Sequence, residues 1–247
     1  MPSKGYVKDH KGESNINNLG TKMIIIECRN NHDIDILFPD YEWVAKNKSY
    51  SNFKKGEIKC PYEPRYYGVG YQGEGEYETM TDAYWCWLSM LKRCYSEKHQ
   101  ENHSSYKECE VCKEWHNYQN FAKWYEKNYY NCNDEIMQLD KDILCKGNKI
   151  YSPQTCIFTP QSINKIFQRR GTNKTSNLPQ GVTIQKEKYV AICNKKYLGR
   201  FSTVEEAFNV YKNFKENYIK QIADEYKMLI PRILYEALYQ YKIEIND

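Results

Sequence analysis

Residues 181–222, GVTIQKEKYVAICNKKYLGRFSTVEEAFNVYKNFKENYIKQI, decide the fold of the C-terminal third of the chain. Three short pieces, GVTIQ, KYVAIC and KYLGRF, have the composition of strands and lead directly into a long helix. Ser202, followed three residues later by Glu205, predicts a capping box at the start of that helix. One apolar stripe then repeats at helical spacing and would lie across a three-stranded sheet. Its members are Ala207, Tyr211, Phe214, Tyr218 and Ile222.

The net charge of the whole chain conceals an uneven distribution. The 247 residues carry 36 basic and 32 acidic side chains, for a formal charge of +4. Residues 141–200 alone hold 12 basic and two acidic side chains, or +10, and the remainder carries −6. Clustered Lys and Arg are the usual footprint of phosphate-backbone binding, although a solvated basic face is the alternative. The sequence therefore indicates a basic centre that could face a polyanion.

The order of patterns along the chain predicts a multidomain α+β protein. Residues 1–75 are typical of a small β-rich N-terminal module, which we expect to be all-β, and the Pro-, Gly- and Tyr-rich residues 60–78 resemble a linker. Residues 76–170 begin with two helices whose Trp and Tyr stripes are expected to be core. Residues 171–247 form the third domain, and Pro231 ends its long helix before a short last one.

Membrane insertion and export are not expected. The longest strongly apolar run, Met23 to Ile26, is far shorter than a membrane span, and residues 1–20 lack an apolar signal region. We therefore expect a cytoplasmic protein of a bacterial cell, with no membrane partner. The ten cysteines are expected to be free thiols or metal ligands rather than disulfides.

Residues 139–164, called the finger below, carry the first recognisable motif. The strings LDKDIL, YSPQTCIF and PQSIN predict strand, turn, strand and helix. They resemble the ββα-metal finger of HNH-type endonucleases, in the branch common in phage and prophage proteins. The resemblance implies phosphodiester hydrolysis with a divalent metal, Mg or Mn, in which Asp140 matches the first metal ligand and Asn164 the ligand on the helix.

The finger departs from that family at its general base. Lys141 stands where the catalytic His normally follows the Asp, and no His occurs after His116. Lysine, with an unperturbed pKa of about 10.4, is a poor base at neutral pH, so Lys141 is expected to hold a phosphate instead. In the alternative interpretation, Asp140 is a turn residue and Asn164 a helix-surface amide, in a finger that kept its fold and lost its activity.

The C-terminal segment carries the second resemblance. The strings GVTIQ, KYVAIC, YLGRF and ST-EEAF-YK are similar to the DNA-binding domain of plant ethylene-response factors. In that family the three-stranded sheet enters the major groove, which makes one face of the sheet the expected DNA contact. We expect Arg200 to read a base edge and the lysines to contact phosphates. A slip of the middle strand by one residue would invert these assignments. The expected sheet contacts are Gln185, Lys188, Lys195, Lys196 and Arg200.

The polar, basic residues 169–179 are predicted to form a flexible linker that follows the phosphate backbone. Its expected DNA contacts are Arg169, Arg170 and Lys174.

A structural zinc site is a further hypothesis. Cys109 and Cys112 form a C-x-x-C, and His99 and His103 lie upstream at an H-x-x-x-H spacing. Zinc favours four sulfur and nitrogen ligands of this kind. The two His could equally lie on a solvent-facing turn.

Two functions from different classes follow from these patterns. The first is a double-stranded DNA-binding protein of phage or prophage type, with weak or lost metal-dependent nicking. The second is a phage effector that uses the same folds to bind and inhibit a host protein.

Overall fold

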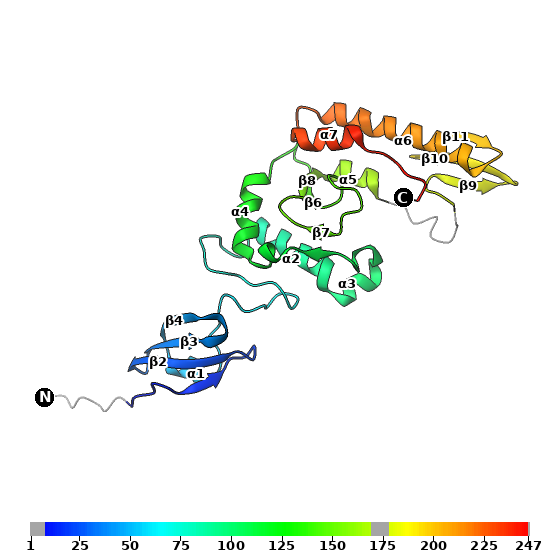
Figure 1. Cartoon of the computed structure of the whole chain (residues 1–247). Helices are drawn as coiled ribbons and strands as arrows, with labels where there is room; N and C mark the ends of the chain where they lie inside the picture. The colour runs from blue at the N-terminus through cyan, green and yellow to red at the C-terminus, as the bar shows by residue number, and fades with distance from the viewer. Residues whose placement is uncertain (1–7, 169–177, 247) are drawn as a thin grey trace. The chain divides into compact units, whose positions relative to one another are not determined.

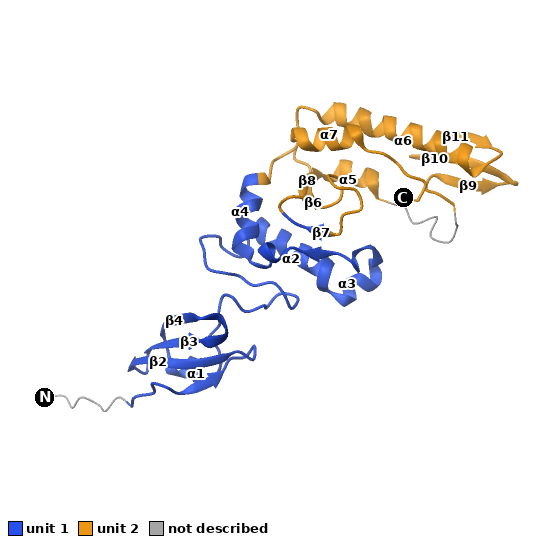
Figure 2. Cartoon of the chain, in the orientation of Figure 1, with its two compact units in different colours: residues 1–127, 150–152 blue, residues 128–149, 153–247 orange. Residues whose placement is uncertain are grey.

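The computed structural model describes residues 8–168 and 178–246 and has an α+β fold with several separate sheets (Figure 1). The predicted α+β class is confirmed. The chain divides into two compact units (Figure 2), unit 1 with residues 1–127 and 150–152 and unit 2 with residues 128–149 and 153–247. The main boundary between the units, between residues 127 and 128, differs from the predicted domain boundaries near residues 75 and 170. Within the described ranges, no helix is both long enough and apolar enough to cross a bilayer.

Unit 1 begins with a four-stranded antiparallel sheet in the order β1-β2-β3-β4. In β3, Ile34, Ile36 and Phe38 alternate with half-buried residues and point into a core of their own. A short helix, α1, follows β4 because Ser49 caps its first turn and Phe53 is buried, so the module is not all-β as its pattern predicted. Its elements are β1 (Ser14–Ile16), β2 (Lys22–Asn30), β3 (Asp33–Phe38), β4 (Trp43–Lys48) and α1 (Tyr50–Lys54).

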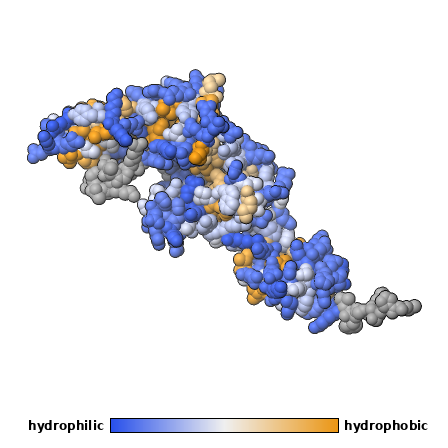
Figure 3. Space-filling model, turned by 180° about the vertical axis from the view of Figure 1, so that it is seen from behind, coloured by the Kyte–Doolittle hydropathy of each residue, from blue (hydrophilic) through white to orange (hydrophobic). Residues whose placement is uncertain are grey.

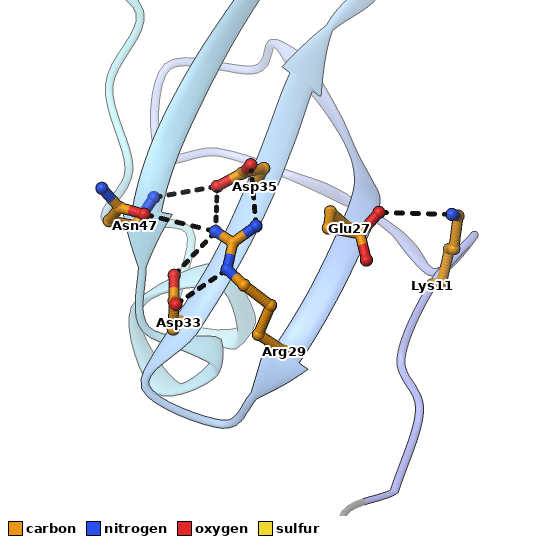
Figure 4. Close-up of polar contacts among 6 residues, drawn as sticks. All are labelled: Lys11, Glu27, Arg29, Asp33, Asp35 and Asn47. Carbon is orange, nitrogen blue, oxygen red and sulfur yellow. Dashed lines mark hydrogen bonds and ion pairs between the residues drawn. The ribbon is translucent and has the colours of Figure 1, made fainter.

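An ion-pair cluster ties together the outer face of this sheet (Figure 4). Arg29 on β2 donates two hydrogen bonds of 2.7 Å to Asp33, and its Nη2 lies 2.6 Å from Asp35. It also donates to the side chain of Asn47 on β4. The guanidinium holds the pKa of both carboxyl groups below their ordinary values. The cluster is exposed, so its contribution to stability is small.

Residues 60–78, which resemble a linker in sequence, pack closely against the helices of unit 1. A Cβ at Gly70 would lie 2.5 Å from the Leu91 side chain, and one at Gly75 would lie 2.3 Å from Gln119. The Gln119 amide also hydrogen-bonds both the N–H and the C=O of Tyr77. The glycines therefore permit close approach of backbone to side chains rather than flexibility.

The rest of unit 1 is helical, around an aromatic core. Trp87, Trp115 and Tyr118 are fully or almost fully buried, and the indole N–H of Trp87 donates to the carbonyl of Trp115 at 2.7 Å. The expectation that these stripes are core is confirmed for these three residues, whereas Trp85 and Tyr129 of the same stripes are 53% and 39% exposed. Two short strands of two residues each, β5 and β7, pair in parallel and complete the unit. The elements are α2 (Asp82–Tyr95), α3 (Glu97–Asn102), β5 (Glu110–Val111), α4 (Tyr118–Asn128) and β7 (Ile150–Tyr151).

Unit 2 contains the predicted three-stranded sheet, in the order β11-β10-β9, packed on the long helix α6. Both hairpins use two-residue turns, Lys186-Glu187 and Asn194-Lys195, in which all four residues have positive φ. Such turns match the twist of the flanking strands. The elements are β9 (Val182–Gln185), β10 (Lys188–Cys193), β11 (Lys196–Phe201), α6 (Val204–Tyr226) and α7 (Arg232–Gln240).

Helix α6 begins one residue later than its sequence pattern predicted. Thr203 is the N-cap, and Glu206 completes the capping box by accepting hydrogen bonds from the backbone N–H groups of Ser202 and Thr203. The predicted Ser202–Glu205 box is therefore wrong by one position, because two overlapping pairs of residues satisfy the same pattern. The glycine before β9 is required by this packing, since a Cβ at Gly181 would lie 2.0 Å from the Tyr211 ring.

The finger belongs to unit 2 and shares its hydrophobic core. Ile157 and Ile163 of the finger lie in one cluster of buried residues with Val182 of the sheet and Ile219 of α6. Its elements are β6 (Met137–Asp140), β8 (Ile157–Pro160) and α5 (Gln161–Phe167), and β6 pairs antiparallel with β8.

Apolar residues reach the visible surface only in limited patches among hydrophilic ones (Figure 3).

Candidate nucleic-acid interface

The face of the β9–β11 sheet that is turned away from α6, called the open face below, carries a line of polar and basic side chains. Ala191 and Cys193 on β10 lie in the core beneath α6, so their alternating neighbours point the other way. Lys188 pairs with Gln185, and Val190 pairs with Arg200. The structure therefore places Gln185, Lys188 and Arg200 together on the open face.

Arg200 is held in position across this face. Its Nη2 donates to the backbone carbonyls of Gln185 and Lys186, both at 2.9 Å, in the turn at the far side of β10. Lys188 donates to the hydroxyl of Ser202 at 3.1 Å. Val190, between them, is only 1% exposed. The guanidinium is thus positioned by backbone carbonyls and stays exposed to solvent.

Two of the expected open-face lysines lie elsewhere, and this is a correction. Lys195 is in the β10–β11 turn, and the ammonium of Lys196 lies 5.0 Å from the centre of the Phe214 ring on α6. The cause is a bulge: Ala191 pairs with Gly199 but Ile192 pairs with Tyr197, so β11 has one extra residue at this point. A bulge inverts the alternation on one side of it, which turns Lys196 to the helix side.

The same bulge brings an unpredicted residue to the open face. Tyr197 pairs with Ile192 and is 61% exposed. Simple alternation in KYLGRF places this ring toward α6, so no signal in the sequence distinguishes it. Arg169, Arg170 and Lys174, the expected contacts of the linker, lie outside the described residues.

The side chain of Asp140 in the finger hydrogen-bonds to the backbone of the loop that follows it. One carboxylate oxygen accepts hydrogen bonds from the backbone N–H groups of Asp142, at 2.9 Å, and Ile143, at 2.8 Å. This is the geometry of a turn-forming Asp. Burial raises the pKa of Asp140 to about 6, and the neighbouring charge of Asp142 adds to the effect.

Lys141, the residue in the place of the general base, is buried. Its ammonium lies 3.0 Å from the carboxylate of Asp142 and donates to the carbonyl of Asn148 at 2.9 Å. The side chain of Asn148 donates in return to the carbonyl of Lys141 at 2.7 Å. These contacts close the loop that follows β6, and they engage the charge that was expected to hold a phosphate.

Asn164 is bonded to a different strand residue. Its amide nitrogen donates to the side-chain oxygen of Gln138 at 2.6 Å, two residues before Asp140 on β6. In the described ranges, no three His, Cys, Asp or Glu side chains are grouped to hold a metal ion. The finger contains no His that could serve as the general base that the resemblance to HNH endonucleases implies.

The hypothetical zinc ligands are not brought together either. His99 lies in α3 and His103 is the C-cap of that helix, and their rings lie 4.4 Å apart. Cys109 is buried and its thiol contacts the carbonyl of Ser105. Cys112 precedes a short 3-10 helix. Within the described ranges these residues do not belong to any group of three or more side chains that could hold a metal ion, and none of the ten cysteines is in a disulfide.

In comparisons with known proteins, no protein-family model, no curated protein and no solved structure matches the chain.

Proposed function

We propose that this chain binds double-stranded DNA through the open face of the β9–β11 sheet. The observation that carries the proposal is the shared face of Gln185, Lys188 and Arg200, with Arg200 positioned by two backbone carbonyls. A strand pair or small sheet can enter the major groove, where Arg and Gln side chains contact base edges. Lys188 supplies a charge for the phosphate backbone.

The finger, in this proposal, contributes to binding and not to efficient cleavage. Unit 2 contains no His, since the last one in the chain is His116. The Lys141 ammonium is engaged by Asp142 and Asn148. Loss of a general base lowers a hydrolysis rate by about a hundred- to ten-thousand-fold. Nicking of DNA is therefore expected to be weak or lost.

Binding to a fluorescent duplex of about 20 base pairs, measured by anisotropy at several salt concentrations, tests the proposal. Lys188→Ala should weaken binding to every sequence and lower the slope of log affinity against log salt by about one. Arg200→Ala should lower affinity by about 5- to 150-fold on a preferred sequence. Lys227→Ala is the matched control, because this exposed lysine lies at the other end of α6 and should bind like the wild type.

A flat salt response, or no binding to any duplex, would contradict DNA binding and favour a protein partner instead.

A separate assay tests whether the finger cleaves DNA. Supercoiled plasmid with Mg²⁺ or Mn²⁺ should show little nicking, and Asp140→Ala should leave DNA affinity unchanged. Robust cleavage that is abolished by Asp140→Ala would show that the finger is an active nuclease.

A further inference from the structure

Arg93, in the last turn of α2, is a half-buried cation. Its Nε donates to the carbonyl of Ser89 at 3.2 Å, and its Nη1 donates to the hydroxyl of Tyr151 at 3.1 Å. The rings of Tyr106 and Tyr151 are centred 6.0 Å and 5.4 Å from the guanidinium carbon. In the part of the chain that the structure describes, no Asp or Glu forms an ion pair with Arg93. A guanidinium has five N–H donors and normally meets a carboxylate or a phosphate when it leaves water, so this one has donors left for an anion.

Two histidines lie beside the same tyrosine. The rings of His99 and Tyr106 are centred 5.9 Å apart, and the rings of His99 and His103 are centred 4.4 Å apart. Burial lowers the pKa of His99, and the positive charges of His103, Lys92 and Arg93 lower it further. These groups are therefore close enough to repel one another. The four side chains, called the cationic corner below, are Lys92, Arg93, His99 and His103.

The cationic corner is held in place by the junction of α2 and α3 (Figure 1). Ser96 is the C-cap of α2 and the N-cap of α3, and its hydroxyl accepts a hydrogen bond from the N–H of His99. The side-chain amide of Gln100 donates to the carbonyl of Cys94 at 2.5 Å and to the carbonyl of Tyr106 at 3.3 Å. Because α3 and the turn at Tyr106 are both tied to the end of α2, the cations are assembled before any ligand binds. Such preorganisation lowers the cost of binding.

The described surroundings of the cationic corner do not balance its charge. The carbonyl end of α2 is equivalent to about half a negative charge, against two positive charges on Lys92 and Arg93. Cys86 is uncharged at neutral pH, because burial raises the pKa of its thiol to about 12. Glu97 and Glu101 on α3 are exposed, and within the described residues neither forms an ion pair with a side chain of the corner. The corner therefore favours a compact ligand with more than one negative charge and several acceptor oxygens.

We propose that the cationic corner binds a phosphate group, with Arg93 as the anchor and His99, His103 and Lys92 as further donors. Arginine suits this role because its planar fork matches the oxygens of a phosphate. Because the corner belongs to unit 1 and the open face to unit 2, phosphate binding here goes beyond the proposed DNA binding and does not depend on it. A phosphate of a DNA backbone and a small phosphate monoester share this chemistry, and the test distinguishes them.

NMR titration of the full chain, with isotope-labelled histidines and a chelator present, tests this site. The probes are sodium sulfate and inorganic phosphate, with sodium chloride at equal ionic strength as the reference. Sulfate and phosphate should shift the signals of His99 and His103 with saturation, whereas chloride should not. The signal of His32, an exposed residue between β2 and β3, is the internal control and should stay unchanged.

Variants assign the binding to the corner. Arg93→Gln should weaken sulfate binding by about 10- to 150-fold, because it removes the charged hydrogen-bond donor. Lys92→Ala/His103→Ala removes only exposed side chains, so the fold is retained, and it should weaken sulfate binding by about 2- to 10-fold. Lys123→Ala is the matched control, because this lysine is exposed on α4 of the same unit and should bind sulfate like the wild type.

Hairpin duplexes with a 5′-phosphate or a 5′-hydroxyl identify the source of the phosphate. Shifts of both histidine signals with both hairpins would assign the site to the DNA backbone. Shifts with the phosphorylated hairpin alone, or with inorganic phosphate alone, would assign it to a terminal or free phosphate. Equal shifts in chloride and sulfate, or wild-type sulfate affinity in Arg93→Gln and in Lys92→Ala/His103→Ala, would overturn the site. Lys188→Ala should leave the sulfate titration unchanged, so failure of DNA binding by the sheet and failure of this site are separate results.

Discussion

Asp140→Asn is predicted to stabilise this protein at neutral pH. The carboxyl group has an ordinary pKa of 3.8, and burial raises it to about 6 in the folded state. Between these values the folded chain holds a proton that the unfolded chain releases. This contribution to stability is present below pH 4 and is lost as the pH rises through 6. At about 1.4 kcal/mol per pKa unit, ionisation of Asp140 costs the folded state about 3 kcal/mol at pH 7.

The asparagine removes that cost while keeping an oxygen for the two backbone N–H groups of the loop. The raised pKa already includes the charge-assisted hydrogen bonds from these N–H groups, so the expected gain is about 3 kcal/mol at pH 7 and none at pH 4. Urea denaturation between pH 4 and 8, with a chelator present, measures it. Asp134→Asn is the matched control, because this carboxyl group is exposed in the same unit and should change little.

Destabilisation by Asp140→Asn at pH 7, or a gain that does not depend on pH, would refute the reasoning. Addition of Mg²⁺ or Mn²⁺ gives a second result from the same samples. A rise in the unfolding free energy of the wild type that is absent in Asp140→Asn would show that the carboxylate binds metal, against the role in the turn described above.

Three further changes test the packing by urea denaturation or calorimetry. Lys186→Asn/Glu187→Gly should raise the free energy of unfolding by about 1 to 2 kcal/mol, because both residues have positive φ and the new pair adopts it readily; an unchanged midpoint would contradict this. Gly181→Ala should lower it by more than about 2 kcal/mol, since the methyl group would meet the Tyr211 ring and φ is +81°. In unit 1, the buried carboxylate of Glu63 forms an ion pair of 3.1 Å with Arg65. Glu63→Gln should lower the free energy of unfolding by about 3 kcal/mol, because it leaves the partly buried Arg65 without its charge partner; a decrease below about 1 kcal/mol would refute a structural ion pair.

The sequence predicted the C-terminal sheet and helix well because their signals are local. Alternation in KYVAIC, turn-forming pairs and a capping pattern each depend on a few neighbouring residues. The sequence-based prediction failed where a single residue decides the geometry. The extra residue in β11 is invisible in KYLGRF, and it moves Lys196 to the helix side and Tyr197 to the open face. The capping pattern was satisfied at two adjacent positions, and only the fold selects Thr203.

Features that depend on distant contacts could not be predicted at all. Glycine and proline in residues 60–78 have the composition of a linker, but the reason for Gly75 is the side chain of Gln119, more than 40 positions later. In the finger, the motif located Asp140 and Asn164 correctly on a strand and a helix. Their hydrogen-bond partners, a turn for Asp140 and Gln138 for Asn164, emerge only from the folded loop.

The short parallel bridge between β5 and β7 has a consequence for the order of folding during synthesis. Residues 150–152 complete unit 1, although 22 residues of unit 2, from 128 to 149, are made before them. Unit 1 therefore cannot close its last bridge until β6 has already left the ribosome without its partner β8. Domains made N-terminal first usually finish in sequence order, whereas here unit 1 closes its last bridge only after the first strand of unit 2, β6, has been made. A C-terminal fragment that begins at residue 128 would carry β7 without β5, the strand that it pairs with.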